Sequence, residues 1–114
     1  MVGLALDGAA ELAKEGIEAE VVDLRTLLPL DEETVLESVK RTSKALILHE
    51  DARTLGIGAE VAATLAEKAY EWLDAPVVRV TAPDTPVPFA PALEAAFLPS
   101  LSTLLSAARR LAAY

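Results

Sequence analysis

The sequence has no cysteine, and this absence excludes a group of chemistries. There is no disulfide framework, no thiol nucleophile and no thiolate metal site. A chain without disulfides is typical of a cytoplasmic or organelle-matrix protein. The sequence also lacks an apolar run near the roughly 18 residues that a membrane span needs. Met1–Leu12 lacks the basic start and long apolar run of a signal peptide. We therefore expect no membrane segment and no targeting segment.

Positive charge is scarce as well. Ten lysines and arginines stand against 18 aspartates and glutamates, which gives a net charge of −8. Such a chain repels phosphate backbones and anionic lipid, and the pair Arg109-Arg110 is too small to form a basic patch. We therefore expect no nucleic acid and no membrane among its partners. The hydrophobic fraction of 53% is high, and this surplus indicates contact with another protein.

The stretch Val21–Leu30 organises the predicted fold. Two valines enter a short strand, and Asp23 and Arg25 form a charged pair at its end. The helix that follows begins near Asp31, whose carboxylate can accept hydrogen bonds from the free amides of the first turn. A strand that leads into a capped helix is one half of a parallel α/β unit.

The rest of the chain repeats this alternation. Strands are predicted over 19–24, 44–49 and 76–81, and helices over 3–15, 31–41, 58–73, 92–97 and after Ser100. An alternative leaves residues 1–6 extended. The order predicts mostly parallel strands with helices on both faces, a three-layer α/β/α arrangement in a single domain, residues 1–114. Trp72 is predicted to be a core anchor. Three strands make a thin sheet, which indicates that one strand is missing.

The single histidine, His49, ends a predicted strand and precedes Glu50 and Asp51. Ligands of parallel α/β sheets bind outside the carboxyl ends of the strands, and a neighbouring carboxylate raises the pKa of a histidine. Direct catalysis is therefore one hypothesis. The other, which we favour, is a histidine that orders the following loop or contacts a partner.

No strong signature of catalysis or cofactor binding stands out. Gly56 and Gly58 precede a predicted helix whose free amides could cradle an anion, but the pair lacks the third glycine of a dinucleotide fingerprint. We favour glycines that permit a tight turn and a close approach of helix to sheet. The carboxylates of residues 31–37 and 67–74 are interpreted as solvated helix faces. We thus predict no catalytic, cofactor-binding or metal-binding residue in this chain.

A proline-rich loop follows the last predicted strand. Residues 83–91 contain four prolines in nine positions, so the loop is expected to be irregular and stiff. It presents Phe89 near Asp84 and Pro86. A stiff loop has little entropy left to lose on binding, which favours an interface. The alternative is a loop that covers the end of the sheet.

Several stretches carry a family resemblance: AAELAKEGIEAEVVDLRTLLPLDEETVLESVKRT, LILHE, GIGAEVA, LDAPVVRVTAPDTPVPFAP and LEAAFLPS. In combination they resemble the C-terminal domain of the β-subunit of thiamine diphosphate-dependent 2-oxoacid dehydrogenases, within the transketolase C-terminal domain family. They cover nearly the whole chain from about Gly3. The resemblance implies a transketolase C-terminal-like fold and a place in a pyruvate, branched-chain oxoacid or acetoin dehydrogenase complex. There the first component decarboxylates a 2-oxoacid and passes the acyl group to a lipoyl arm.

The same resemblance implies that the chemistry lies elsewhere. In the family, thiamine diphosphate and magnesium are held by the α-subunit and by the N-terminal domain of the β-subunit, so this chain alone is expected to bind neither. The implied partners are the remainder of the β-subunit, the α-subunit and the acyltransferase core. The resemblance implies an interface role for six residues: His49, Glu50, Arg53, Asp84, Pro86 and Phe89. Leu55 departs from the glycine that is usual in its loop.

The resemblance also explains the thin sheet. Family members have one more strand before the first helix, and it lies between the strands that match 19–24 and 44–49. Its loss leaves two ladders of unpaired amides and carbonyls, which are costly to bury and prone to pair with another chain. We therefore expect this chain to self-associate or to use Val2–Leu6 as a makeshift strand. The expected function is that of a C-terminal assembly domain, not catalytic alone; the alternative is a free-standing protein-interaction module on the same fold.

Overall fold

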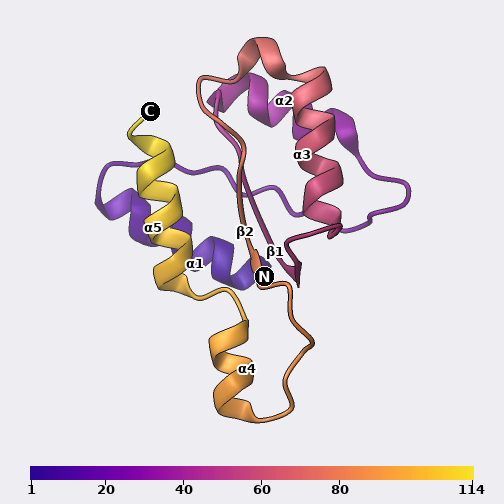
Figure 1. The fold of residues 1–114 in the computed structure, drawn as a ribbon. Helices are drawn as coiled ribbons and strands as arrows, with labels where there is room; N and C mark the ends of the chain where they lie inside the picture. The colour runs from indigo at the N-terminus through magenta and orange to yellow at the C-terminus, as the bar shows by residue number, and fades with distance from the viewer.

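The computed structural model describes all 114 residues and has two strands among its helices. In chain order the elements are α1 (Val2–Lys14), α2 (Glu32–Thr42), β1 (Leu46–Ala52), α3 (Ile57–Lys68), a 3-10 turn η1 (Tyr70–Trp72), β2 (Val78–Ala82), α4 (Pro91–Phe97) and α5 (Leu101–Ala112). Figure 1 shows α2 and α3 on one side of the strands and α1 and α5 on the other. The predicted three-layer α/β/α arrangement is confirmed.

The two strands pair in parallel, as the alternating order of elements predicts. Leu46 lies opposite Val78 and Leu48 lies opposite Val80, and the register shifts between Leu48 and Ala52. The crossover between them is made by α3 and η1, which pack on one face. The predicted strands over 44–49 and 76–81 therefore both form, displaced by a few residues towards the C-terminus.

The predicted strand over 19–24 does not form. The sheet contains β1 and β2 alone, and residues 18–23 make no hydrogen bond between backbone groups. A strand exists only when a neighbour accepts and donates along its ladder, and a cavity separates this stretch from β1. The charged pair predicted at its end is present, with Arg25 Nε 2.8 Å from Asp23 Oδ2.

Two of the predicted helices begin at the caps that the sequence indicates. Asp31 accepts a hydrogen bond from the Thr34 amide at 3.0 Å and so caps α2. Ser100 caps α5 in a reciprocal arrangement with Thr103, each side chain accepting from the other residue's backbone amide. Each such cap contributes about 1 kcal/mol. These two helices consequently keep their predicted starts within a residue.

The prediction for Trp72 is wrong. Helix α3 ends at Lys68 rather than near Leu73, and the chain continues as a 3-10 turn. Three residues per turn in place of 3.6 rotate Trp72 out of the buried stripe of the helix, so that 39% of it is exposed. Its ring instead lies 4.9 Å from the Lys40 ammonium in a cation–π contact. Leu65 and Ala69 fill the core, with Val39 of α2 packed beside them.

The N-terminal residues are helical. Val2–Leu6 belongs to α1, so neither the makeshift strand nor the extended alternative for residues 1–6 is correct. Gly8 lies buried where α1 crosses α5, and a Cβ there would stand 2.7 Å from Leu104 Cδ2. The glycine thus allows close approach of the two helices. None of the helices has the length and apolar character that crossing a membrane requires.

Candidate functional site

His49 lies within β1, with its side chain packed under the start of α3. A Cβ on Gly58 would stand 2.2 Å from His49 Nε2, and a Cβ on Gly56 would stand 3.0 Å from His49 Cε1. The two glycines therefore permit the close approach of helix to sheet that the sequence indicates. The imidazole occupies the space that a side chain on Gly58 would take.

The imidazole of His49 is neutral at physiological pH. Both ring nitrogens are inaccessible to solvent, and neither has a hydrogen-bond partner. Burial lowers the pKa of His49, the Asp51 carboxylate opposes this shift, and the Arg79 guanidinium adds to it. The loop-ordering hydrogen bonds favoured from the sequence are therefore absent. Neither ring nitrogen is hydrogen bonded to a nucleophile or to an acid, so this geometry gives the catalytic hypothesis no support.

The loops that follow β1 and β2 are fastened to each other. Asp84 accepts from the Thr54 amide at 2.8 Å and from the Thr54 hydroxyl at 2.7 Å. These hydrogen bonds lower the pKa of Asp84. Arg53 donates to the Arg79 carbonyl at 3.2 Å, and Arg79 donates to the Arg53 carbonyl at 2.8 Å. The structure thus brings Arg53 and Asp84 together at one end of the sheet.

Leu55 follows Thr54 in the loop after β1. It stands where the resemblance implies a glycine. It has a φ of 61°, in the left-handed region that glycine adopts without strain and a leucine does not. Its side chain is 96% exposed and so packs against nothing. A φ in this region suits the glycine that the resemblance implies at this position.

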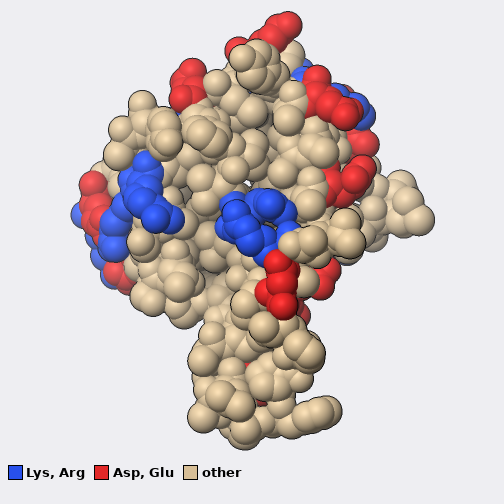
Figure 2. Space-filling model, viewed as in Figure 1, with Lys and Arg blue, Asp and Glu red and all other residues tan.

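An apolar arm projects from this end of the molecule (Figure 1). We define it as residues 83–99, the proline-rich loop followed by α4; the loop is irregular, as predicted. Phe89 is fully exposed, and Val87 and Leu93 are 65% and 60% exposed. The arm is almost free of charge on the face that Figure 2 shows. Exposed apolar side chains on a projecting element are typical of a protein contact.

The six residues expected at an interface therefore occupy three settings. Asp84, Pro86 and Phe89 lie on the arm or at its base and are exposed. Glu50, within β1, and Arg53, just after it, are exposed. His49 is half-buried against the start of α3.

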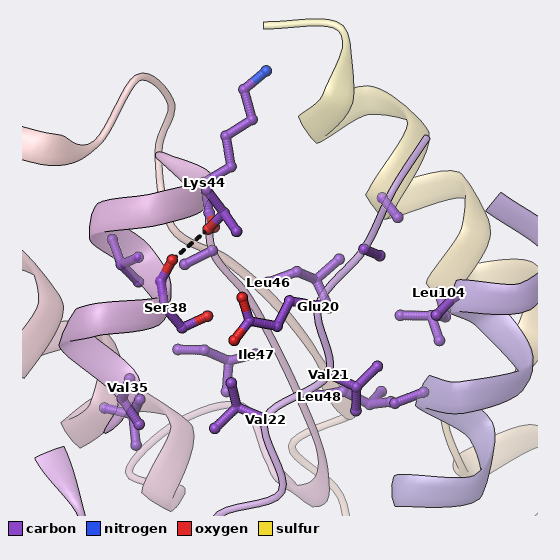
Figure 3. Close-up of a pocket in the computed structure, with 18 of the residues that line it drawn as sticks. Glu20, Val21, Val22, Val35, Ser38, Lys44, Leu46, Ile47, Leu48 and Leu104 are labelled. Carbon is purple, nitrogen blue, oxygen red and sulfur yellow. Dashed lines mark hydrogen bonds between the residues drawn. The ribbon is translucent and has the colours of Figure 1, made fainter. Parts of the chain in front are cut away.

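One feature of the structure, an apolar cavity, was missed from the sequence as a site. A cavity of about 540 Å³ lies between residues 18–24 and β1, and helices of both layers wall it. Figure 3 shows Val35 and Ser38 on one side of it and Leu104 on the other. The lining is predominantly apolar. The strand that the resemblance implies to be missing was the signal that could have found this cavity. From the sequence we inferred only unpaired backbone groups there, and not an empty space.

The residues present do not fit a diphosphate cofactor or its magnesium ion. No three histidine, aspartate or glutamate side chains converge to form a metal site. The cavity is lined mainly by apolar side chains. Magnesium and phosphate groups require oxygen ligands and positive charge, respectively.

Comparisons with known proteins agree with this architecture. Residues 1–104 match the family described as transketolase, C-terminal domain. The β-subunit of acetoin:2,6-dichlorophenolindophenol oxidoreductase from Cupriavidus necator is 48% identical over 110 residues, which is 96% of this chain and 32% of that protein. The β-subunit of the pyruvate dehydrogenase E1 component from Rickettsia felis is 42% identical over 113 residues, 99% of this chain and 35% of that protein.

A solved structure is similar as well. A protein described as a split gene transketolase, inactive beta4 tetramer, has a TM-score of 0.80 and 31% identity, covering 96% of this chain and 34% of that chain. The present chain thus spans about a third of the length of the proteins it matches.

Proposed function

The chain belongs to the transketolase C-terminal domain family, and on that premise we propose that it is the C-terminal assembly domain of the β-subunit of a 2-oxoacid dehydrogenase decarboxylating component. The complete component carries out the oxidative decarboxylation of a 2-oxoacid with acyl transfer to lipoamide. The observation that carries the proposal is an identity of 42–48% to β-subunits of acetoin and pyruvate enzymes over almost the whole chain.

In this proposal the chain is not catalytic alone. Its residues do not form a site for thiamine diphosphate or magnesium, which belong to the remainder of the β-subunit and to the α-subunit. The chain contributes contact surface to those two partners and to the acyltransferase core. The arm, together with Glu50, Arg53 and Asp84, forms the proposed contacts. All of these residues are exposed, and Arg53 and Asp84 belong to the two loops that are fastened together at one end of the sheet.

The arm supports an assembly role on physical grounds. Burial of the exposed part of Phe89 alone contributes about 1.5 kcal/mol or more. The hydrogen bonds from Thr54 to Asp84 hold the base of the arm in place before binding. A preorganised apolar element loses little conformational entropy when a partner covers it.

Reconstitution tests the proposal. The chain is mixed with the Cupriavidus necator β-subunit truncated before the matching region, and with the α-subunit of the same enzyme, thiamine diphosphate and magnesium. We expect a stoichiometric complex in light scattering and recovery of acetoin- or pyruvate-dependent reduction of 2,6-dichlorophenolindophenol. Neither the chain alone nor the other components alone should reduce the dye at that rate.

A pair of variants shows whether the arm is the contact. Phe89→Ser should weaken the complex by about 10-fold or more, whereas Tyr114→Ser, which removes another exposed aromatic ring outside the arm, should leave it unchanged. A chain that neither associates nor restores turnover would overturn the proposal. The free-standing interaction module on the same fold would then be the better interpretation.

A further inference from the structure

The chain that leads from β1 into α3 closes against the side chain of His49. We call residues 53–58 the junction. A Cβ on Gly58 would stand 2.2 Å from His49 Nε2, and a Cβ on Gly56 would stand 3.0 Å from His49 Cε1, so only a backbone without side chains fits beside the ring. Neither ring nitrogen reaches solvent or a hydrogen-bond partner. The junction therefore separates the imidazole nitrogens from water.

Two features make the closed junction unfavourable by itself. The ring nitrogens of His49 lose their hydrogen bonds to water and gain none in return. Leu55 has a φ of 61°, which strains a residue with a Cβ, and its side chain is 96% exposed, so no burial compensates for the strain. Both costs disappear when the junction leaves the strand. The closed form must consequently be held by contacts elsewhere.

Those contacts tie the junction to β2 and to the base of the arm. The Thr54 amide and hydroxyl donate to Asp84 at 2.8 and 2.7 Å. Arg53 donates to the Arg79 carbonyl at 3.2 Å, and Arg79 donates to the Arg53 carbonyl at 2.8 Å. Figure 1 shows the end of β1, the start of α3 and the start of the arm at the same end of the molecule. A few exposed hydrogen bonds thus balance the strain, which makes the junction a local two-state element.

Charges of both signs surround the junction. They are Glu50 and Asp51 of β1, Arg53, Glu60 of α3, Arg79 of β2 and Asp84. The Asp51 carboxylate raises the pKa of His49 and the Arg79 guanidinium lowers it, but burial is the largest cause, and it lowers the pKa. The imidazole therefore stays neutral while the junction is closed.

We propose that the junction is a pH-sensitive latch: protonation of His49 opens it and releases Asp84, so that the base of the arm is fixed at neutral pH and freed in acid. The proton comes from water, and the imidazolium needs hydrogen bonds that the closed junction does not offer. The opening is local, because Val61 and Leu65 keep the rest of α3 buried in the core. The latch is a property of this chain and does not rest on the proposed function.

The size of the effect follows from proton linkage. In the open form the imidazole is in water and has a pKa of about 6.5. A group whose pKa is lower in the closed form binds its proton preferentially in the open form, so opening increases as the pH falls. Between pH 7.5 and 5.5 the open population should rise by about 10-fold. Asp84 stays ionised over this window, because its hydrogen bonds to Thr54 lower its pKa.

Amide hydrogen exchange of the whole chain, followed by NMR, tests the latch. The Thr54 amide reports opening, and the Thr34 amide is the matched control, since Thr34 donates to Asp31 from both its amide and its hydroxyl, at 3.0 and 2.7 Å, in the cap of α2. After correction for intrinsic rates, protection of Thr54 should fall by about 10-fold from pH 7.5 to 5.5, and that of Thr34 should stay within about 2-fold. Thr54 should also exchange at least about 10-fold faster than Leu65 of the core, because local opening is less costly than global unfolding.

Two variants separate the proton from the strain. His49→Gln takes up no proton in this window, so the protection of Thr54 should no longer depend on pH. Leu55→Gly removes the strain of a positive φ without changing the titration. It should therefore raise the protection of Thr54 by about 5-fold at both pH values and preserve the ratio between them.

Three outcomes would overturn the inference. Protection of Thr54 that stays level between pH 7.5 and 5.5 would mean that no proton opens the junction. The same fall in His49→Gln as in the original chain would assign the pH dependence to another group. Equal protection of Thr54 and Leu65 would mean that the junction opens only when the whole chain unfolds. None of these bears on the proposed function, which is tested by restored turnover.

Discussion

Residues 19–24 and residues 78–82 are similar in sequence and different in structure. The first stretch, AEVVDL, and the second, VRVTA, both contain two valines; the first has two carboxylates and the second has one arginine. Residues 78–82 form β2 in register with β1, whereas residues 19–24 form no strand. Because the backbone of a strand is satisfied only by a neighbour, the difference lies in the neighbour and not in the side chains.

The sharpest test of this comparison replaces one valine in each stretch with proline. Val80 has its amide on the edge that faces β1, in phase with the Val78 amide that donates to Ala45. Val80→Pro should lower the free energy of unfolding by about 3 kcal/mol, whereas Val22→Pro should change it by less than about 1 kcal/mol. Urea denaturation followed by circular dichroism measures both. Similar losses in the two variants would mean that residues 19–24 are paired in solution.

The next comparison concerns packing on the two sides of β1. Gly58 lies against His49 on the side where α3 closes over the strand, with no room for a Cβ. Gly58→Ala should therefore lower the free energy of unfolding by about 1–3 kcal/mol. His49→Ala in the same chain should restore part of the loss, because it removes the atoms that the new methyl group meets. If the double variant is no more stable than Gly58→Ala, the contact with His49 is not the cause.

A larger side chain placed at the cavity should raise the free energy of unfolding, whereas Gly58→Ala should lower it. Ala108 of α5 lines the cavity beside residues 18–24. Ala108→Leu adds apolar atoms to unfilled space in a helix that tolerates leucine well, so it should raise the free energy of unfolding by about 1 kcal/mol. Thermal and urea denaturation measure the change. A loss of stability would show that the cavity has closed in solution and that the two sides of β1 are equally well packed.

The smallest effect is a pH dependence of stability that comes from His49, which packs against the start of α3. Its pKa in the folded chain is lowered by burial from the usual value of about 6.5. As the pH falls through about 6.5, the unfolded chain takes up a proton that the folded chain does not, so stability falls until the lowered pKa is reached. Denaturation midpoints between pH 7.5 and 5.5 should decrease in the original chain. In His49→Gln they should stay level over this window, because the carboxylates with lowered pKa values, such as Asp31 and Asp84, titrate at lower pH.

Much of the fold could be predicted from local signals. Asp31 and Ser100 cap helices because their side chains accept from amides within the next turn, a contact that needs no distant residue. The alternation of helices and apolar runs predicted a parallel sheet between two layers. Trp72 was misplaced because its orientation depends on the change from α-helical to 3-10 geometry after Lys68, which no local pattern marked.

The site was less accessible to prediction than the fold. The proline-rich loop was predicted to be stiff and to expose Phe89, and in the structure that ring is fully exposed. The role of the loop as an interface stays a prediction. The burial of His49 was not predicted, since it follows from the approach of α3 over β1. The cavity required residues 18–24, β1 and helices of both layers, which lie far apart in the chain, to be placed together.

By itself the sequence determined the helices, their caps, the parallel order of the strands and the family, because these depend on periodicity, on contacts within a turn and on the combination of motifs. Only the tertiary structure decided that residues 19–24 lie unpaired across a cavity from β1, and that His49 is enclosed by α3. The pairing of a strand and the burial of a side chain depend on which distant segment of the chain packs beside them. A stretch with the residue pattern of a strand forms no ladder of backbone hydrogen bonds when no neighbouring strand lies beside it.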